Sequence, residues 1–490
     1  MRCQVSDFRC QASRIKPQWM ILLLLPALTV SAQAQTQAET KVIADPFAQP
    51  PVHAPAAAAV RPEPARIEGA VAGGLRWLAE HQLQQGAEAG AWSVNVGNYR
   101  PAVASLAGLA FLANGYLPGT NAPYNKTVAS ALKYVTGTMA SDGYIGQGDR
   151  SGMYIHAISS LFALSCLGMQ TEEKVEPDLA EWCRRSLNVI VKSQQMSKSA
   201  IERGGWRYDP YTSESDVSIT CWQLLVLHTA RQAGFEVEPS VFSSALAYLN
   251  RAYVPVKSEQ GQEKSGLVGG YLYRPGYTYE PSRSSTALVL FIQSLFDAVD
   301  EQRKRQVLRY LSRYPLTWDG NQYGGYFFFS GFYMVQGMFQ VGGDDWNSFG
   351  PRMATLLLDH QSGDGTWPYP PGNVAQEQMQ STGPAYPVAM AVLMLSLDKQ
   401  YLPMYQRQSR IYERNTPAVQ AAERPADADT DPGVKEPKKR PVQVEPEMPP
   451  VAPPAPVGGP TTQVTVPEAG GDEEPGEDAA PSPIGRPVFK

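Results

Sequence analysis

The clearest candidate for acid chemistry is Asp216, which lies in Ser215-Asp-Val-Ser-Ile-Thr220 just before a run of apolar residues. A carboxyl group in such a place can donate or accept a proton when burial or neighbouring charge shifts its pKa. Asp is also one of the residues that most often cap the first turn of a helix. We therefore treat Asp216 as a weak catalytic candidate and favour its interpretation as a helix cap.

Other polar and aromatic residues gather at the starts of the expected helices. The candidates for a ligand cavity are Asp149, Arg150, Tyr154, His156, Arg207, Tyr208, Asp209, Asp216, Tyr326 and Tyr333. Carboxylates combined with aromatic side chains suit sugar polymers, and aromatic rings also stabilise cations. The alternatives are that the charged residues cap solvated turns and that the aromatic residues pack in the core.

No metal or cofactor site is predicted. His156 and His228 are isolated on apolar segments, where a single histidine is more often a hydrogen-bonded core residue than a ligand. The cysteines beyond the N-terminal segment are Cys166, Cys183 and Cys221, without C-x-x-C spacing. This number allows one disulfide without selecting its pair, and three buried apolar side chains are the favoured interpretation.

The two ends of the chain differ in composition from its centre. Residues 1–34 contain four basic residues, an apolar run and a small-x-small pattern ending at Ala34, which predict a signal peptide and export to the periplasm, cell envelope or exterior. An uncleaved N-terminal anchor is the alternative. Residues 35–65 are predicted to be an Ala/Pro-rich linker. Residues 405–490 are predicted to be a disordered tail, because they are rich in Pro and Glu and poor in aromatic residues.

The charge of the chain excludes one class of partner. The net charge is −5 at pH 7, and residues 35–420 carry only −2 of it. A nearly neutral body lacks the clustered basic face that nucleic-acid binding needs. We expect no nucleic-acid partner, and peripheral association with a membrane or the cell envelope is an open alternative.

The centre of the chain, residues 66–404, contains six repeats. Each begins with an amphipathic segment that ends in two apolar residues, at Trp77-Leu78, Tyr134-Val135, Ile190-Val191, Tyr248-Leu249, Tyr310-Leu311 and Leu356-Leu357. A corner with glycine and an aromatic residue follows, at Trp92, Tyr144, Trp206, Tyr271, Tyr326 and Trp367. A second, more apolar helix comes next, at roughly 101–114, 151–168, 216–233, 282–297, 328–341 and 381–397.

These two kinds of helix predict the architecture. A helix that is apolar on all sides must be buried, and an amphipathic helix can cover it from outside. Two concentric rings satisfy both requirements, whereas an open solenoid needs polar capping repeats that we do not find. We therefore predict an all-α fold, an (α/α)6 toroid of six outer and six inner helices.

The sixth corner carries a specific motif. Gln361-Ser-Gly-Asp-Gly365-Thr-Trp367 fully matches Q-x-x-x-G-x-W, so that residues 66–404 resemble the squalene-hopene cyclase and prenyltransferase repeat superfamily. The resemblance implies that the glutamine ties helix ends together and that the tryptophan packs on it. The residues assigned to this structural role are Trp77, Gln82, Trp92, Gln195, Trp206, Gln361, Gly365 and Trp367. His81 and His360 precede the glutamine and are assigned to the same scaffold.

The resemblance also indicates which chemistry is not expected. The segment at Asp216 is similar to the cyclase motif D-x-D-D-T, but the acid that protonates the substrate falls on Ser218 and the next acid on Ile219. A serine hydroxyl cannot protonate an alkene. The zinc ligands of the related prenyltransferases and a D-D-x-x-D diphosphate site are not found either. The sequence therefore leaves open whether the protein is an enzyme.

The leading hypothesis is an exported terpenoid-cyclase-like repeat protein that binds an apolar or aromatic-stacking ligand in the cavity of its toroid. The alternatives are an enzyme acting on isoprenoids or lipids, a polysaccharide lyase or hydrolase, and a structural module for protein interactions. The expected ligand is accordingly a small apolar molecule or a polymer, because the fold by itself does not determine the function.

Overall fold

The computed structural model describes residues 61–119, 123–149, 151–169, 175–256, 268–277, 280–318, 326–371 and 381–407. The chain divides into two units, Met1–Ile411 and Tyr412–Lys490, and all of these residues belong to the first. The predicted signal peptide, most of the predicted linker and tail, and the candidate residue Arg150 lie outside the described residues.

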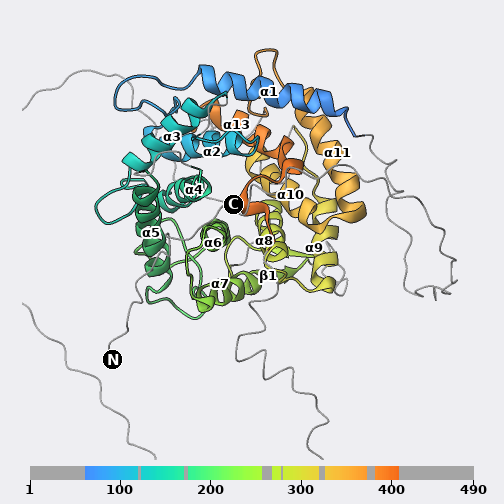
Figure 1. Ribbon diagram of the computed structural model, residues 1–490. Helices are drawn as coiled ribbons and strands as arrows, with labels where there is room; N and C mark the ends of the chain where they lie inside the picture. Colours follow the sequence, from blue (N-terminus) through green and yellow to red (C-terminus); the bar gives the residue numbers. More distant parts are fainter. Residues whose placement is uncertain are drawn as a thin grey trace, which may run out of the picture. The chain divides into compact units, whose positions relative to one another are not determined.

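Six amphipathic helices form the outer layer of the first unit (Figure 1). They are α1 (Pro64–Glu80), α3 (Asn125–Gly137), α5 (Val175–Gln194), α7 (Pro239–Arg251), α9 (Glu301–Arg313) and α11 (Gly343–Asp359). Helix α3 illustrates their pattern, because it buries only Val128, Ala131, Leu132 and Val135. These positions lie on one stripe of a helix with 3.6 residues per turn, so that the rest of α3 faces solvent.

Six apolar helices form the inner layer. They are α2 (Arg100–Leu112), α4 (Gly152–Ser165), α6 (Val217–Gln232), α8 (Arg283–Leu295), α10 (Phe327–Val341) and α13 (Ala385–Leu395). Every residue of α4 except Tyr154 is buried, as expected of a helix that is covered on all sides. The shorter elements are η3 (Gly97–Tyr99), the antiparallel strands β1 (Tyr253–Pro255) and β2 (Gly269–Tyr271), η4 (Leu397–Lys399) and η5 (Pro403–Tyr405).

The inner helices close into a ring. Helices α2, α4, α6, α8, α10 and α13 pack against one another in this order, and α13 packs back against α2 (Figure 1). The last corner also meets the first outer helix, because Gln361 Nε2 donates to the Ala70 carbonyl of α1 at 2.9 Å. A Cβ on Gly365, whose φ is +93°, would lie 2.6 Å from the Gly73 carbonyl oxygen, so that this contact requires glycine. The predicted (α/α)6 toroid is confirmed, and an open solenoid is excluded.

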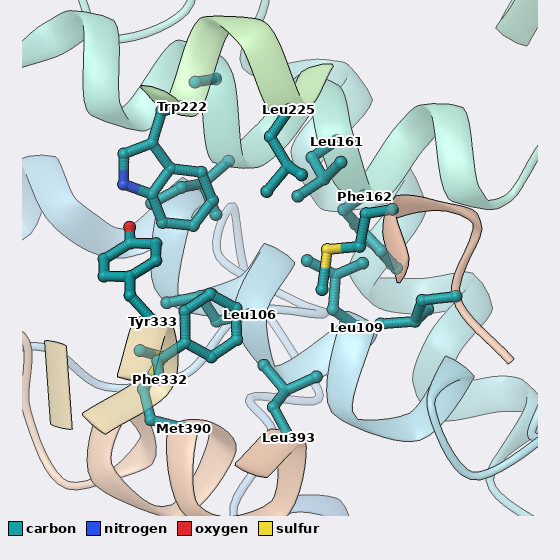
Figure 2. Close-up of a cluster of buried hydrophobic side chains, with 14 of the residues drawn as sticks. Leu106, Leu109, Leu161, Phe162, Trp222, Leu225, Phe332, Tyr333, Met390 and Leu393 are labelled. Carbon is teal, nitrogen blue, oxygen red and sulfur yellow. The ribbon is translucent and has the colours of Figure 1, made fainter. Parts of the chain in front are cut away.

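Apolar side chains fill the axis of the ring (Figure 2). The side chains around it come from α2, α4, α6, α10 and α13, and each is at most 2% exposed: Leu106, Leu109, Leu161, Phe162, Trp222, Leu225, Phe332, Tyr333, Met390 and Leu393. Within the described residues these side chains pack against one another rather than line an open axial chamber. The expectation of a ligand cavity in the toroid therefore stays a prediction, and within the described residues large side chains of the inner helices occupy the axis itself.

Two further properties of the described residues bear on the sequence-based expectations. Cys166, Cys183 and Cys221 are buried, and burial raises the pKa of the Cys166 and Cys221 thiols. No helix within the described part of the chain combines the length and the apolar composition that crossing a membrane requires.

Candidate functional site

Three corners share a hydrogen-bond pattern that places the starts of the inner helices. In the first repeat, the Trp92 indole donates to the Leu78 carbonyl of α1 at 2.8 Å. The Gln82 amide donates to the carbonyls of Gly90 and Thr127 at 2.9 Å each, and Thr127 belongs to α3. The glutamine thus joins two neighbouring outer helices, and the tryptophan holds the corner against the end of the first one.

The sixth corner repeats this pattern. The Trp367 indole donates to the Leu357 carbonyl at 2.7 Å, and the Gln361 amide donates to the carbonyls of Gly365 and Ala70 at 3.1 and 2.9 Å. In both corners the carbonyl that accepts the indole lies four residues before the glutamine. The glutamine and the tryptophan are therefore placed by the same last turn of the outer helix.

In the third corner the glutamine that donates its side-chain amide is Gln194. The sequence pattern predicts Gln195 for this role. Gln194 Nε2 donates to the Val241 carbonyl of α7 at 2.9 Å, and Trp206 donates to the Ile190 carbonyl at 2.7 Å. Gln195 is exposed to solvent. One residue rotates a side chain by about 100° around a helix, so only Gln194 points toward the corner.

The two histidines before these glutamines belong to the scaffold. Nδ1 of His81 lies 2.8 Å from the Trp77 carbonyl oxygen, and Nδ1 of His360 lies 2.8 Å from that of Leu356. The rings stack on the indoles of Trp77 and Trp318, with centroids 4.1 Å apart in each pair. Among the described residues no group of three or more His, Cys, Asp or Glu side chains is arranged to hold a metal ion.

His156 does not line the end of the ring, so its selection as a ligand-binding candidate is corrected. Its Nδ1 accepts the Ile145 backbone N–H at 3.2 Å, and its Nε2 lies 3.1 Å from the Ser186 carbonyl oxygen of α5. The side chain is buried, and burial lowers its pKa to about 4. A neutral ring therefore ties the second corner to α5, in the same way that glutamine ties the first, third and sixth corners.

Asp216 caps α6 at the end of the ring where the inner helices begin. Its Oδ1 accepts the Ile219 backbone N–H at 2.8 Å and the Ser218 hydroxyl at 2.7 Å. The side chain is fully buried. Burial raises the pKa of this carboxyl, against these two hydrogen bonds, the positive charge of Arg207 and the neighbouring Tyr273 hydroxyl. One of the two carboxyl oxygens, Oδ1, thus caps the first turn of α6, as expected of an N-cap residue.

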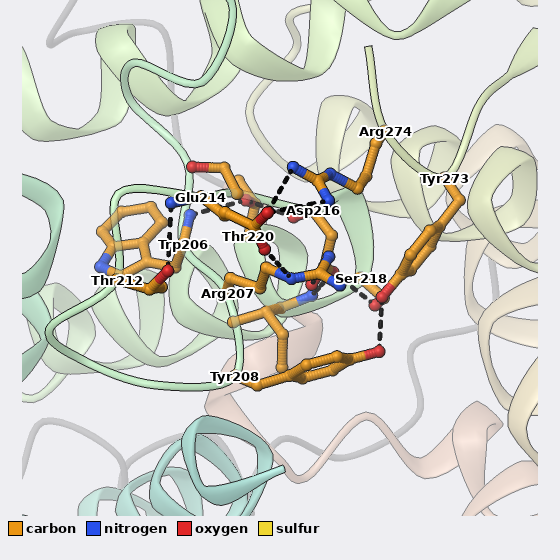
Figure 3. Close-up of polar contacts among 12 residues, drawn as sticks. Trp206, Arg207, Tyr208, Thr212, Glu214, Asp216, Ser218, Thr220, Tyr273 and Arg274 are labelled. Atoms are coloured by element: carbon orange, nitrogen blue, oxygen red, sulfur yellow. Dashed lines mark hydrogen bonds and ion pairs between the residues drawn. The ribbon is translucent and has the colours of Figure 1, made fainter. Parts of the chain in front are cut away.

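Four partly exposed tyrosines surround this cap, and we call them the tyrosine mouth: Tyr154 of α4, Tyr208 of the third corner, Tyr273 after β2 and Tyr326 before α10 (Figure 3 shows two of them). The Tyr208 and Tyr273 hydroxyls form a hydrogen bond, and the rings of Tyr154 and Tyr208 lie 6.0 Å apart. Phe329 joins the group, because its ring lies 6.3 Å from those of both Tyr154 and Tyr326. The mouth therefore combines side chains from four different repeats.

The other tyrosine candidate, Tyr333, lies deeper. Its side chain is 1% exposed and packs against Trp222 and Phe332 on the axis of the ring. Phe329 connects it to the tyrosine mouth, with ring centroids 5.0 Å apart. Tyr333 therefore belongs to the packed core and not to the exposed surface.

Arg207 brings a positive charge into the tyrosine mouth (Figure 3). Its guanidinium lies 4.7 Å from the ring centre of Tyr208 and 5.9 Å from that of Tyr273. Its Nε pairs with a Glu214 carboxylate oxygen at 2.9 Å, and its Nη1 lies 3.6 Å from Asp216 Oδ2. One guanidinium thus faces two carboxyl groups, of which Asp216 is buried and Glu214 is half exposed.

A second arginine extends this charged group away from the mouth. Arg274 pairs with Glu202 at 2.7 Å and approaches Glu214 at 3.5 Å. Its side chain and that of Glu202 are largely buried. Glu214 therefore contacts both arginines and connects the third corner to the segment after β2.

The remaining acidic candidates shape turns. Asp149 Oδ1 accepts the Ser151 backbone N–H at 2.6 Å, and Asp209 Oδ1 accepts the Tyr211 backbone N–H at 2.7 Å. Both bonds join a residue to the N–H two positions later, which is the hydrogen bond of an Asx turn. This favours the interpretation of these carboxylates as turn residues over their interpretation as ligand contacts.

The sequence-based candidates do not include Ser218 and Tyr273, which the ring brings to the mouth, or Glu214 and Arg274, which form the charged group beside it. The Tyr154 hydroxyl donates to Ser218 Oγ at 2.5 Å, which links α4 to the cap of α6. A signal for Tyr273 was present, because Tyr273 follows the corner aromatic Tyr271 by two positions. Tyr208 follows its own corner aromatic by the same two positions.

Comparisons with known proteins leave the family open. No protein-family model matches the chain, and no curated protein matches it. Among solved structures, the chain is similar to an inactive variant of the α-1,6-mannanase GH76A of Salegentibacter sp. HEL1_6 in complex with α-1,6-mannotriose. The two share 12% identity over 68% of this chain and 99% of that one, with a TM-score of 0.45. A likeness at this level says nothing of the activity of this chain.

Two buried polar atoms at the mouth have no hydrogen-bond partner within the described residues. They are Asp216 Oδ2 and Arg207 Nη1, which face each other at 3.6 Å. Buried polar groups are nearly always hydrogen-bonded in folded proteins, so a buried ion pair at this distance without a hydrogen bond requires an explanation. Asp216 Oδ2 can accept a hydrogen bond, and Arg207 Nη1 can donate one. A ligand group that does both could therefore engage the two together.

Proposed function

We propose that the ring binds a hydroxyl-rich ligand of the carbohydrate class at the tyrosine mouth. The observation that carries this proposal is the pair formed by Asp216 Oδ2 and Arg207 Nη1, buried and without hydrogen-bond partners among the described residues. Because both atoms are buried, a ligand reaches them only after a side chain of the mouth moves aside; a sugar hydroxyl can then donate to the carboxyl oxygen while it accepts from the guanidinium N–H. An apolar ligand could satisfy neither atom.

The aromatic residues of the mouth support the same class of ligand. Tyr154, Tyr208, Tyr273 and Tyr326 are partly exposed, although most large apolar residues of the ring are buried. Binding sites for small ligands typically combine aromatic walls with a few polar groups that fix orientation. We therefore propose the end of the ring as the place of the aromatic-stacking ligand expected from the sequence, because side chains occupy the axis of the ring.

This proposal also includes two expectations from the sequence, the family resemblance and the export of the protein. The motif at the sixth corner supports a relationship to the squalene-hopene cyclase and prenyltransferase repeats, and the basic and apolar pattern of residues 1–34 supports export. Ser218 occupies the position of the cyclase acid and is hydrogen-bonded to Asp216. A carbohydrate-binding protein outside the cytoplasm is consistent with both features and requires no terpene cyclisation.

Hydrolysis of the bound glycan is a second candidate function, favoured by the unequal environments of two carboxyl groups. Asp216 is buried with a raised pKa, and Glu214 is half exposed, while both face Arg207. Glycosidases use one carboxyl group as an acid and another as a base or nucleophile, with environments that separate their roles. Asp216 would be the acid in such a reaction and Glu214 its partner.

The direct test is calorimetric titration of the full chain with a panel of soluble neutral oligosaccharides. We expect a member of the panel to bind and the Tyr208→Ala and Arg207→Gln variants to bind at least about tenfold more weakly, which is the loss of roughly one hydrogen bond to a charged group. Tyr211→Ala is the matched control, because Tyr211 lies three residues away and is 66% exposed.

The outcomes separate the two candidates. Equal affinity of the Tyr208→Ala variant and the wild type, or no binding to any member of the panel, would contradict the proposed ligand class. Release of new reducing ends by the wild type, abolished in Asp216→Asn with binding retained, would establish hydrolysis. Binding without such release would leave a carbohydrate-binding protein.

A further inference from the structure

Three polar groups near the axis of the ring lack hydrogen-bond partners within the described part of the chain. They are Trp222 Nε1 on α6, and the Tyr333 hydroxyl and the Gln336 side-chain amide on α10. The exposed fractions of these side chains are 2%, 1% and 2%. Bulk water therefore cannot serve as their partner, and their burial requires a partner inside the protein.

Two of the three groups lie close together, and the third is on the same helix as one of them. The rings of Trp222 and Tyr333 meet edge to face with centroids 5.9 Å apart, and in Figure 2 the hydroxyl end of Tyr333 points toward the nitrogen-bearing edge of Trp222. Gln336 follows Tyr333 by three positions on α10, and residues so spaced share a helix face. None of the three groups forms a hydrogen bond with another.

The other buried glutamines of the inner helices have at least one partner within the described residues, and Gln223 of α6 donates to the Met153 carbonyl at 3.0 Å while its Oε1 has no partner. Gln340, about one turn after Gln336, donates to the Tyr405 carbonyl at 2.8 Å and accepts from Arg407 Nε at 2.8 Å. Gln293 of α8 accepts the Tyr271 hydroxyl at 2.8 Å. Among these buried glutamines of the described residues, only Gln336 has neither its amide nitrogen nor its amide oxygen in a hydrogen bond.

We propose that one small neutral molecule, ordered water or an alcohol of similar size, is bound between α6 and α10 at Trp222, Tyr333 and Gln336. The indole N–H can only donate, the glutamine amide donates and accepts, and the tyrosine hydroxyl does both. An oxygen that accepts from the indole and donates to the amide oxygen satisfies this set. Buried waters in proteins typically make about three such hydrogen bonds. This site is independent of ligand binding at the tyrosine mouth.

The first test compares two buried tyrosines by thermal unfolding of the full chain. Tyr333→Phe removes a hydroxyl that the proposed molecule would hold, and Tyr271→Phe removes a hydroxyl that is bonded to Gln293. We expect both variants to lower the Tm by about 2 °C or more. An unchanged or raised Tm for Tyr333→Phe, with a lowered Tm for Tyr271→Phe, would mean that the Tyr333 hydroxyl has no partner and would overturn the proposal.

The second test is a crystal structure of the wild-type chain, which does not depend on the folding of a variant. We expect an electron-density peak within about 3.2 Å of at least two of the three groups. The absence of such a peak, or direct pairing of the three side chains with one another, would overturn the proposal. A crystal soaked in methanol distinguishes the sources, because an alcohol would enlarge the peak and a tightly held water would leave it unchanged.

Discussion

The corners of the ring and its tyrosine mouth use buried polar side chains in different ways. At the first, third and sixth corners the glutamine amide donates to two carbonyls and the indole to a third. At the mouth, Asp216 Oδ2 and Arg207 Nη1 are buried without such partners among the described residues. Polar groups that hold the fold together are satisfied within it, whereas these two atoms form an ion pair at 3.6 Å without a hydrogen bond.

The two regions meet in the third corner. Trp206 is fully buried and donates its indole N–H to Ile190, while the next residue, Arg207, reaches into the mouth. The Trp206 carbonyl also accepts the Asp216 backbone N–H at 2.8 Å. The tryptophan therefore sets the positions of both residues that are left with unpartnered atoms. In this corner the repeat scaffold has a direct part in building the candidate site.

The largest effect is expected from Trp206→Ala. Removing a fully buried tryptophan typically costs about 3–5 kcal/mol of unfolding free energy, and here it also removes the hydrogen bond to Ile190. We expect ligand binding to be lost as well, because Arg207 and Asp216 are held by the same residue. Urea unfolding and calorimetric titration measure the two effects.

The matched control for this change is Trp367→Ala in the sixth corner. Trp367 is 1% exposed and donates to the Leu357 carbonyl in the same way. We expect a similar loss of stability, with binding retained under conditions in which the variant stays folded. Equal loss of ligand binding in both variants would contradict the idea that the third corner has a special part in building the mouth.

A smaller effect is expected from Gln194→Ala. The change leaves the carbonyls of Gly204 and Val241 without their donor, and an unsatisfied buried group costs about 1–3 kcal/mol. Gln195→Ala serves as the control, because Gln195 is exposed and surface substitutions usually stay within about 0.5 kcal/mol of the wild type. The urea midpoints of the two variants show which of the two glutamines stabilises the corner. A larger loss for Gln195→Ala would restore the assignment made from the sequence.

The sequence was sufficient to predict the ring. The apolar stretch expected at 216–233 forms α6 at Val217–Gln232, and the other inner helices also begin and end within a few residues of their expected limits. This succeeded because an all-apolar helix leaves a strong periodic signal and the signal recurs six times. The choice between Gln194 and Gln195 failed, because it depends on the phase of the helix at its last turn.

The candidate site could be predicted only in part, because the ring assembles it from distant repeats. Tyr208 and Asp216 stand close together in the sequence and were selected together. Tyr273 and Arg274 follow Asp216 by more than fifty positions, and the packing of α6 against α8 brings Tyr273 to the mouth and Arg274 to Glu214. His156 was selected for its place at the start of α4, but it faces an outer helix. Its orientation depends on helix phase and on tertiary contacts that periodicity does not contain.

The smallest stability effect is expected from Asp216→Asn, and it depends on pH. Burial raises the pKa of the Asp216 carboxyl, so that its contribution to stability is fully present below the unfolded pKa of about 4 and is lost as the pH rises through the folded pKa. Asparagine keeps an oxygen for the α6 cap and has no carboxyl proton to lose. We expect an unfolding free energy within about 1 kcal/mol of the wild type near pH 4, with the difference shifting in favour of the variant toward pH 7. Urea unfolding at both pH values measures it. If the difference in unfolding free energy stays constant between the two pH values, the Asp216 carboxyl ionises as it does in the unfolded chain. Asp216 would then be as well satisfied by its neighbours as the glutamines of the corners are by theirs.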